Sequence, residues 1–278
     1  MELIPAATLV HKFHRVPPII DPHYLEHMYS LLEKESIDII IPLIDLDLFL
    51  FPSDSPRLYE LGIISTAPPL HTVCTLSDKR SLHHFLISQG IPTPSLYQID
   101  EIDPHETYVV KSAVGFGSRN FRILKGSDIV VAHIGDDNII QEFCAPENNT
   151  YEITAEIFCS GDILKIFCRE RIETKAGVCT KMKPFSDESI ELSLKKLTSS
   201  ILCPTAFCVQ FMYNAGKWKI IDCNLRLGAG TALSSAIGFQ LTRALLLTLL
   251  QQSVPDEIFL VNPSVKSVVR VYDEVVIT

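Results

Sequence analysis

The stretch that decides the fold runs from residue 208 to residue 230 and reads Cys-Val-Gln-Phe-Met-Tyr-Asn-Ala-Gly-Lys-Trp-Lys-Ile-Ile-Asp-Cys-Asn-Leu-Arg-Leu-Gly-Ala-Gly. Two apolar runs flank residues 214–216, which is the pattern of two β-strands joined by a short turn. Because Gly216 can adopt the left-handed conformation, we expect a hairpin with a three-residue loop that pairs Tyr213 with Lys217.

That register decides which side chains share a face of the hairpin. Because strand side chains alternate, a three-residue loop places Gln210, Asp222 and Asn224 on one face, whereas a two-residue loop would send Gln210 to the other. One carboxylate and two amide oxygens, followed by Arg226, suit Mg²⁺ bound together with substrate phosphates better than they suit zinc. The alternative is an ordinary hairpin whose polar residues cap its end.

Composition bounds the class of protein. The chain has 278 residues, 47% of them hydrophobic, which is enough for two domains with substantial cores. A net charge of -9 argues against nucleic-acid binding, which needs a basic surface.

The cysteines and the apolar segments indicate a cytoplasmic location. Reduced, buried thiols are expected because the cysteines form no CxxC pair and lie in apolar runs. There is neither a secretory signal pattern nor an apolar run as long as a membrane span, so no membrane partner is expected. The 8 cysteines are Cys74, Cys144, Cys159, Cys168, Cys179, Cys203, Cys208 and Cys223.

The first ~75 residues have the pattern of a doubly wound α/β domain. A helix that begins at Asp21 and Pro22 leads into a buried strand at 37–42, and a second short strand follows at 61–64. Residues 1–16 contain no glycine, although such a domain usually opens with a strand and a glycine-rich turn. Either the first βαβ unit is missing or a reduced version of the domain suffices.

A glycine-containing hairpin follows in the middle of the chain. Ser77-Asp78-Lys79 begins a helix that Gly90 is positioned to end. The strand 108–111 leads into residues 112–119, and strand character resumes at 121–124. Backbone NH groups of such a tip can surround phosphates, although a flexible turn has the same composition. The sequence contains neither a P-loop nor a Rossmann fingerprint.

The second half alternates in the manner of an antiparallel sheet. After a strand at 138–143, we expect two paired strands, a helix, the hairpin described above, one long helix and a last strand. These lie at 151–158, 163–171, 188–202, 208–224, 231–252 and 267–276.

Several of these pieces coincide in an order that resembles the ATP-grasp superfamily. The similarity is strongest to the ATP-grasp units of the carbamoyl phosphate synthetase large subunit and its stand-alone relatives, and it covers essentially the whole chain. The resemblance implies a partial Rossmann-like domain (1–75), a small α+β lobe (76–145) and a large C-terminal lobe (146–278) that hold ATP between them. The motifs are Asp78-Lys79, Lys111 before the glycine loop, Gln141-Glu142-Phe143, Val209-Gln210-Phe211, Asp222-x-Asn224-x-Arg226 and Thr231 to Phe239.

The resemblance implies two cations and a lid at the ATP phosphates. Lys79 and Lys111 match the positions that contact phosphate, and residues Gly115, Phe116, Gly117 and Ser118 match the lid above it. Two surface lysines are the alternative, although an unpaired ammonium on the apolar strand of Lys111 would be costly.

The nucleoside part of ATP would lie at a hinge between the lobes. Glu142, Phe143 and Cys144 match the segment that reads the adenine edge, although Phe143 could equally belong to the core. Glu152 matches the carboxylate that holds the ribose hydroxyls. Because about three extra residues separate Glu152 from the hinge, Glu147 is a rival for that role.

The resemblance assigns the metal and the chemistry to the hairpin. Gln210, Asp222 and Asn224 match the positions that bind Mg²⁺, or alternatively Mn²⁺, between the phosphates. Arg226 matches the arginine that stabilises the transferred phosphoryl group, a task it would share with Lys111. The usual motif has glutamate and proline where this chain has Asp222 and Leu225, and both changes are chemically tolerable.

A further basic group lies near the expected hinge. Arg169, Arg171 and Lys175 could contact a carboxylate substrate or the γ-phosphate, or could form a solvated basic edge.

The implied activity is that of an ADP-forming ligase. ATP would phosphorylate a carboxylate to an acyl phosphate, and an amine or similar nucleophile would displace the phosphate. One alternative is an ATP-binding partner subunit of a split carbamoyl-phosphate-synthetase-like enzyme, because the N-terminal domain that helps to form the acceptor site is short. A homodimer or another chain would then complete the site. A scaffold that binds no nucleotide is the remaining alternative.

Overall fold

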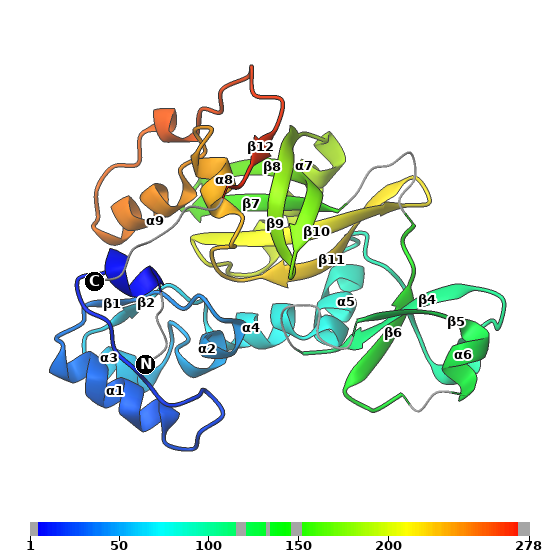
Figure 1. The fold of residues 1–278 in the computed structure, drawn as a ribbon, viewed down its shortest axis with the longest axis horizontal. Coiled ribbons are helices and arrows are strands. Elements are labelled where there is room, and N and C mark those ends of the chain that lie inside the picture. Colours follow the sequence, from blue (N-terminus) through cyan, green and yellow to red (C-terminus); the bar gives the residue numbers. More distant parts are fainter. Residues whose placement is uncertain (1–4, 115–120, 132–133, 146–151, 272–278) are drawn as a thin grey trace.

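The computed structural model describes residues 5–114, 121–131, 134–145 and 152–271 of the chain. Figure 1 shows an N-terminal α/β part, a small antiparallel sheet, and a larger antiparallel sheet with helices packed on it. This mixed α/β architecture with antiparallel sheets is the fold class expected from the sequence. Within the described ranges, no helix combines the length and the apolar character that crossing a membrane requires.

The N-terminal part is built around a two-stranded parallel sheet of β1 and β2. Helix α1 begins at Tyr24 rather than at Asp21, because Asp21 accepts hydrogen bonds from the backbone NH groups of His23 and Tyr24 in a preceding turn. Buried Tyr29 and Phe51 pack edge to face in the local core. The elements are η1 (Pro5–Leu9), α1 (Tyr24–Lys34), β1 (Ile39–Ile40), α2 (Asp45–Leu50), α3 (Pro56–Glu60) and β2 (Ile64–Ser65).

The small sheet is antiparallel and has the strand order β3-β6-β4-β5. The helix before it begins as expected, because the Asp78 carboxylate accepts hydrogen bonds from the NH groups of Arg80 and Ser81 at 2.9 Å each. Gly90 follows that helix with a φ of 59°. The elements are α4 (Leu70–Ser77), α5 (Lys79–Ser88), β3 (Leu96–Tyr97), η2 (Ile99–Glu101), β4 (Thr107–Ser112), β5 (Arg122–Lys125), α6 (Gly126–Val131) and β6 (Asn138–Glu142).

The large sheet has the order β11-β10-β7-β8-β9-β12, and all of its neighbouring strands are antiparallel. Side chains from α2, α4, α5 and α7 pack on one face, whereas α8 and α9 pack on the other. The elements are β7 (Ile153–Ser160), β8 (Ile163–Lys175), β9 (Val178–Phe185), α7 (Glu188–Ser200), β10 (Ala206–Asn214), β11 (Lys217–Asn224), α8 (Thr231–Ser235), α9 (Leu241–Leu249), η3 (Asp256–Phe259) and β12 (Val268–Val269).

One expectation for the C-terminal half was wrong, and one strand was missed. The helix expected over 231–252 is two helices, because Gly238 adopts a φ of 117° between them, and a Cβ atom there would overlap the carbonyl of Leu260. Strand β9 was not expected at all. Of the last expected strand, the structure shows β12, and residues 272–276 lie outside the described part.

Candidate active site

The hairpin of β10 and β11 has a tighter turn than expected. Asn214 pairs with Lys217 and Tyr213 with Trp218, so the predicted pairing of Tyr213 with Lys217 is wrong. Ala215 and Gly216 form a two-residue loop with φ values of 49° and 77°. Positive φ at both central positions is the conformation that matches the twist of a hairpin.

A β-bulge in the hairpin places the side chains of Gln210 and Asp222 on the same face, although the tighter turn alone would have separated them. Phe211 pairs with Ile220, but Gln210 pairs with Asp222, which leaves Ile221 as an extra residue in β11. The predicted shared face of Gln210 and Asp222 is therefore confirmed, although through a different register. The bulge also lets apolar residues on both sides of it face the same core, namely Trp218, Ile220, Cys223 and Leu225.

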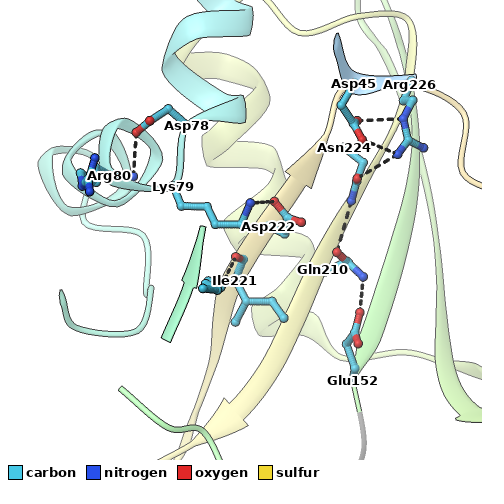
Figure 2. A network of polar contacts seen from close by, with 11 residues as sticks. Asp45, Asp78, Lys79, Arg80, Glu152, Gln210, Ile221, Asp222, Asn224 and Arg226 are labelled. Atoms are coloured by element: carbon cyan, nitrogen blue, oxygen red, sulfur yellow. Dashed lines mark hydrogen bonds and ion pairs between the residues drawn. The ribbon is translucent and has the colours of Figure 1, made fainter. Parts of the chain in front are cut away.

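Two lysines of the small-sheet region contact β11 at the bulge. The Lys111 ammonium donates a hydrogen bond to the Ile221 carbonyl at 3.3 Å. Lys79, the first residue of α5, has its Nζ atom 3.7 Å from Oδ1 of Asp222 and is only 9% exposed. Figure 2 shows the Lys79 side chain extending from the helix start toward Asp222. Lys79 thus lies beside the Asp222 carboxylate, and Lys111 contacts the backbone one residue before it.

The Lys111 ammonium is destabilised in this environment. Burial lowers its pKa to about 8, and Lys79 lowers it as well, while the negative charge of Asp222 opposes the shift. An anion placed between the two lysines would be attracted by both and would restore the charged form of Lys111. The pair therefore has the electrostatics of a phosphate site.

A chain of polar contacts crosses the floor of the site (Figure 2). The Gln210 amide donates a hydrogen bond to Glu152, and its oxygen accepts one from the Asn224 amide at 3.2 Å. The Asn224 oxygen accepts a bond from Arg226 at 3.4 Å, and Arg226 also donates to Asp45 at the start of α2. The network joins the N-terminal part to the large sheet.

The donor set of the hairpin fits Mg²⁺ held together with phosphates. Gln210, Asp222 and Asn224 supply three hard oxygens with one negative charge, which is too little to hold the ion without further ligands. In the described part of the chain, no three His, Cys, Asp or Glu side chains gather into a metal cluster. Phosphate oxygens beside Lys79 and Lys111 would supply the missing charge.

The carboxylate of Glu142 is already engaged at the expected hinge. It accepts hydrogen bonds from Lys219 and Asn214 at 2.5 Å each and from the NH of Ser95 at 3.0 Å. Burial raises the pKa of Glu142, but these bonds outweigh it, so the pKa lies below its usual range. In this arrangement Glu142 ties β6 to the β10–β11 hairpin, and reading adenine with the carboxylate would need one of these bonds to open.

The other hinge residues follow β6 directly. Phe143 is half-buried, and Cys144 is buried with its pKa raised to about 11 by desolvation and by the nearby Glu142 charge. The expected lid residues Gly115, Phe116, Gly117 and Ser118 lie outside the described residues, as does Glu147.

The three basic residues near the hinge have different surroundings. Arg169 is 3% exposed and forms an ion pair with the fully buried Glu156. This burial contradicts an exposed substrate contact or a solvated basic edge for Arg169. Arg171 binds Glu152 and donates to the Gly177 carbonyl at 2.7 Å, whereas Lys175 is exposed near the end of β8.

Two residues of the site were missed in the sequence. Asp45 follows strand β1 by five positions, and the carboxyl ends of strands in an α/β sheet are where sites form, so its position was a usable signal. Lys219 alternates with Trp218 and Ile220 on β11, which places it on the polar face of the hairpin. Its partner Glu142 lies 77 residues away and could not be found from local pattern.

Comparisons with known proteins identify the fold and the family of the chain. Residues 1–66 match the PylC-like N-terminal domain, and residues 76–230 match the ATP-grasp domain. Pyruvate carboxylase from Rhizobium etli superposes with a TM-score of 0.67 at 17% identity, over 91% of this chain and 25% of that chain. The biotin carboxylase domain of 2-oxoglutarate carboxylase from Hydrogenobacter thermophilus superposes with a TM-score of 0.65 at 15% identity. The superposition covers 84% of this chain and 58% of that chain.

A third similar structure is carboxyaminoimidazole ribonucleotide synthase from Aspergillus clavatus in complex with ATP. Its TM-score is 0.67 at 13% identity, over 93% of this chain and 71% of that chain. A search of curated proteins found no match to the sequence. The chain thus spans about a quarter of the length of the pyruvate carboxylase and somewhat over half of the length of the 2-oxoglutarate carboxylase chain. Since the domain match covers more than half of its length, the chain belongs to the ATP-grasp family.

Proposed function

We propose that the protein is a Mg²⁺- and ATP-dependent ligase that activates a carboxylate as an acyl phosphate and joins it to an amine or similar nucleophile. The observation that carries the proposal is that Lys79 pairs with Asp222 and Lys111 binds the neighbouring Ile221 carbonyl, on the strand pair that carries Gln210 and Asn224. Cations and hard oxygen ligands within one cleft are what a triphosphate with its metal requires.

Each residue of the proposed site has a task in the reaction. Lys79 and Lys111 bind the phosphates, and Gln210, Asp222 and Asn224 hold Mg²⁺, which neutralises charge on the phosphates when bound. Arg226 stabilises the transferred phosphoryl group. Glu142, Phe143, Cys144 and Glu152 line the nucleoside end.

The proposed reaction predicts where the oxygen atoms of the carboxylate substrate end. A carboxylate oxygen attacks the γ-phosphorus, the bond to the bridging oxygen breaks, and ADP leaves. The nucleophile then attacks the carbonyl carbon and the C–O bond to the phosphate breaks. One original carboxylate oxygen therefore ends in inorganic phosphate.

The test uses the full-length chain with MgATP and pools of ¹⁸O-labelled amino acids and small carboxylic acids. Bicarbonate belongs in the pool because the structure from Hydrogenobacter thermophilus was determined with MgADP and bicarbonate. We expect ADP release that depends on one pool and phosphate that carries one ¹⁸O atom. ADP release with unlabelled phosphate contradicts the acyl phosphate. Binding of MgATP with no turnover on any pool favours the ATP-binding partner subunit.

A further inference from the structure

The ion pair between Asp45 and Arg226 connects positions 181 residues apart in the sequence. The guanidinium donates through Nε to Oδ1 at 2.8 Å and through Nη2 to Oδ2 at 2.7 Å, so the contact is bidentate. Both side chains are largely shielded, with 18% of Asp45 and 17% of Arg226 exposed. The proposed function assigns no role to Asp45.

The contacts of Arg226 use most of its donors. Besides the two bonds to Asp45, Nη2 donates to Asn224 at 3.4 Å and Nη1 donates to the Leu227 carbonyl at 3.2 Å. A guanidinium has about five N–H groups, so among the described residues these four bonds leave one N–H, on Nη1. Asp45 therefore fixes both the plane of the guanidinium and the end that is left for a ligand.

Both partners of the pair are anchored in one core. Leu48, one turn after Asp45 in α2, is 1% exposed and belongs to the same buried cluster as Leu225, which immediately precedes Arg226. Asp45 also lines a small cleft together with Asp222 and Asn224. The carboxylate thus lies at the border of the proposed metal site, and buried neighbours anchor both partners of the ion pair.

We infer that Asp45 is a positioning residue that holds the Arg226 guanidinium in place for the transferred phosphoryl group. The inference rests on the proposed function, because it assigns Asp45 to the same site. An arginine side chain is long and has several rotatable bonds, and small displacements of a catalytic group weaken its contact with the reacting atoms. A carboxylate that binds the Nε–Nη2 edge removes that freedom and leaves the Nη1 end for the ligand.

The experiment measures binding of MgADP alone and of MgADP with aluminium fluoride, which mimics a phosphoryl group in transfer. Asp45→Asn should bind MgADP as the wild type does, but should bind the aluminium fluoride complex at least about tenfold more weakly, because a charge-assisted contact is no longer held in place. Asp47→Asn is the matched control. Asp47 lies on the same helix and accepts a hydrogen bond from Tyr24, away from Arg226.

A second variant, Asp45→Glu, keeps the charge but adds one methylene group. It should fold as the wild type does and bind the aluminium fluoride complex less tightly, since the guanidinium is displaced. Wild-type affinity in either folded variant overturns the inference. Arg226→Gln separates the two proposals. If it weakens binding while the Asp45 variants do not, only the positioning role fails. If Arg226→Gln has no effect, the role of Arg226 in the proposed function fails.

Discussion

Gln210 and Asp222 are direct cross-strand partners, and the extra residue Ile221 in β11 makes them so. Without that residue, the two-residue loop of the hairpin would place their side chains on opposite faces. The same bulge frees the Ile221 carbonyl to accept the hydrogen bond from Lys111. One irregularity thus aligns the proposed metal ligands and positions a lysine beside them.

The first prediction concerns Mg²⁺. Asp222→Asn should reduce the gain in ATP affinity that Mg²⁺ provides by at least about tenfold, because the proposed metal set loses its one negative charge. Titration calorimetry with ATP in the presence and absence of Mg²⁺ measures this gain. Asp162→Asn is the control, since Asp162 lies in the exposed turn between β7 and β8. An unchanged gain in Asp222→Asn would contradict the metal assignment.

The second prediction concerns protons. Burial lowers the pKa of Lys111 to about 8, and bound phosphate should raise it, so the complex holds more protons than the free protein near that pH. ATP affinity should therefore fall as the pH rises through 8. At pH 8.5 we expect uptake of up to about 0.8 proton on binding. Calorimetry in two buffers with different ionisation enthalpies measures the uptake. Lys111→Arg should abolish it, because arginine stays protonated; persistent uptake in that variant would assign the proton to another group.

The third prediction concerns the contact between the two sheets. Lys219→Met should lower the free energy of unfolding by about 1–3 kcal/mol at pH 7, because it leaves the shielded Glu142 carboxylate without its cation. The pKa of Glu142 lies below 4.5, so the stability that this pair contributes is present at neutral pH and is lost as the pH falls through that lowered value. The difference from the wild type should shrink there.

Urea denaturation of both proteins between pH 7 and pH 3 checks the prediction. Lys217→Met is the matched control, because Lys217 lies two positions away on the same strand and is exposed. If Lys217→Met lowers the free energy of unfolding as much as Lys219→Met does, the hairpin is sensitive to any lysine replacement and the prediction is wrong.

Features with a local cause could be predicted from the sequence. The helix that starts after Asp78 was predicted from its start signal and apolar spacing, and β4 and the hairpin strands were predicted from their apolar patterns. Strand β9 was missed because Lys181, Lys183 and Pro184 give it the composition of a loop, and proline normally argues against an inner strand.

The bulge and the Asp45 contact could not be predicted in the same way. The adjacent Ile220 and Ile221 interrupt the alternation of β11, which was a visible signal, but only the packing of Trp218 and Cys223 on one core decides that an extra residue is inserted there. The pairing of Asp45 with Arg226 depends on how the N-terminal part packs against the large sheet. No local pattern records a contact across 181 residues.

The last prediction concerns the glycine after the hairpin. Gly230 has φ and ψ values of -81° and -11°, which alanine adopts freely, so backbone strain would not oppose a substitution. A Cβ atom there would instead overlap the guanidinium of Arg169, which is buried in an ion pair with Glu156. Gly230→Ala should therefore lower the free energy of unfolding by about 1–3 kcal/mol, because the buried guanidinium must shift and its bond to Glu156 is strained. Gly135→Ala is the control: its Cβ would lie 3.6 Å from the Asn138 amide, an ordinary contact, and should change stability by less than about 0.5 kcal/mol. Equal urea midpoints for wild type and Gly230→Ala would mean that Arg169 can leave Glu156 at little cost.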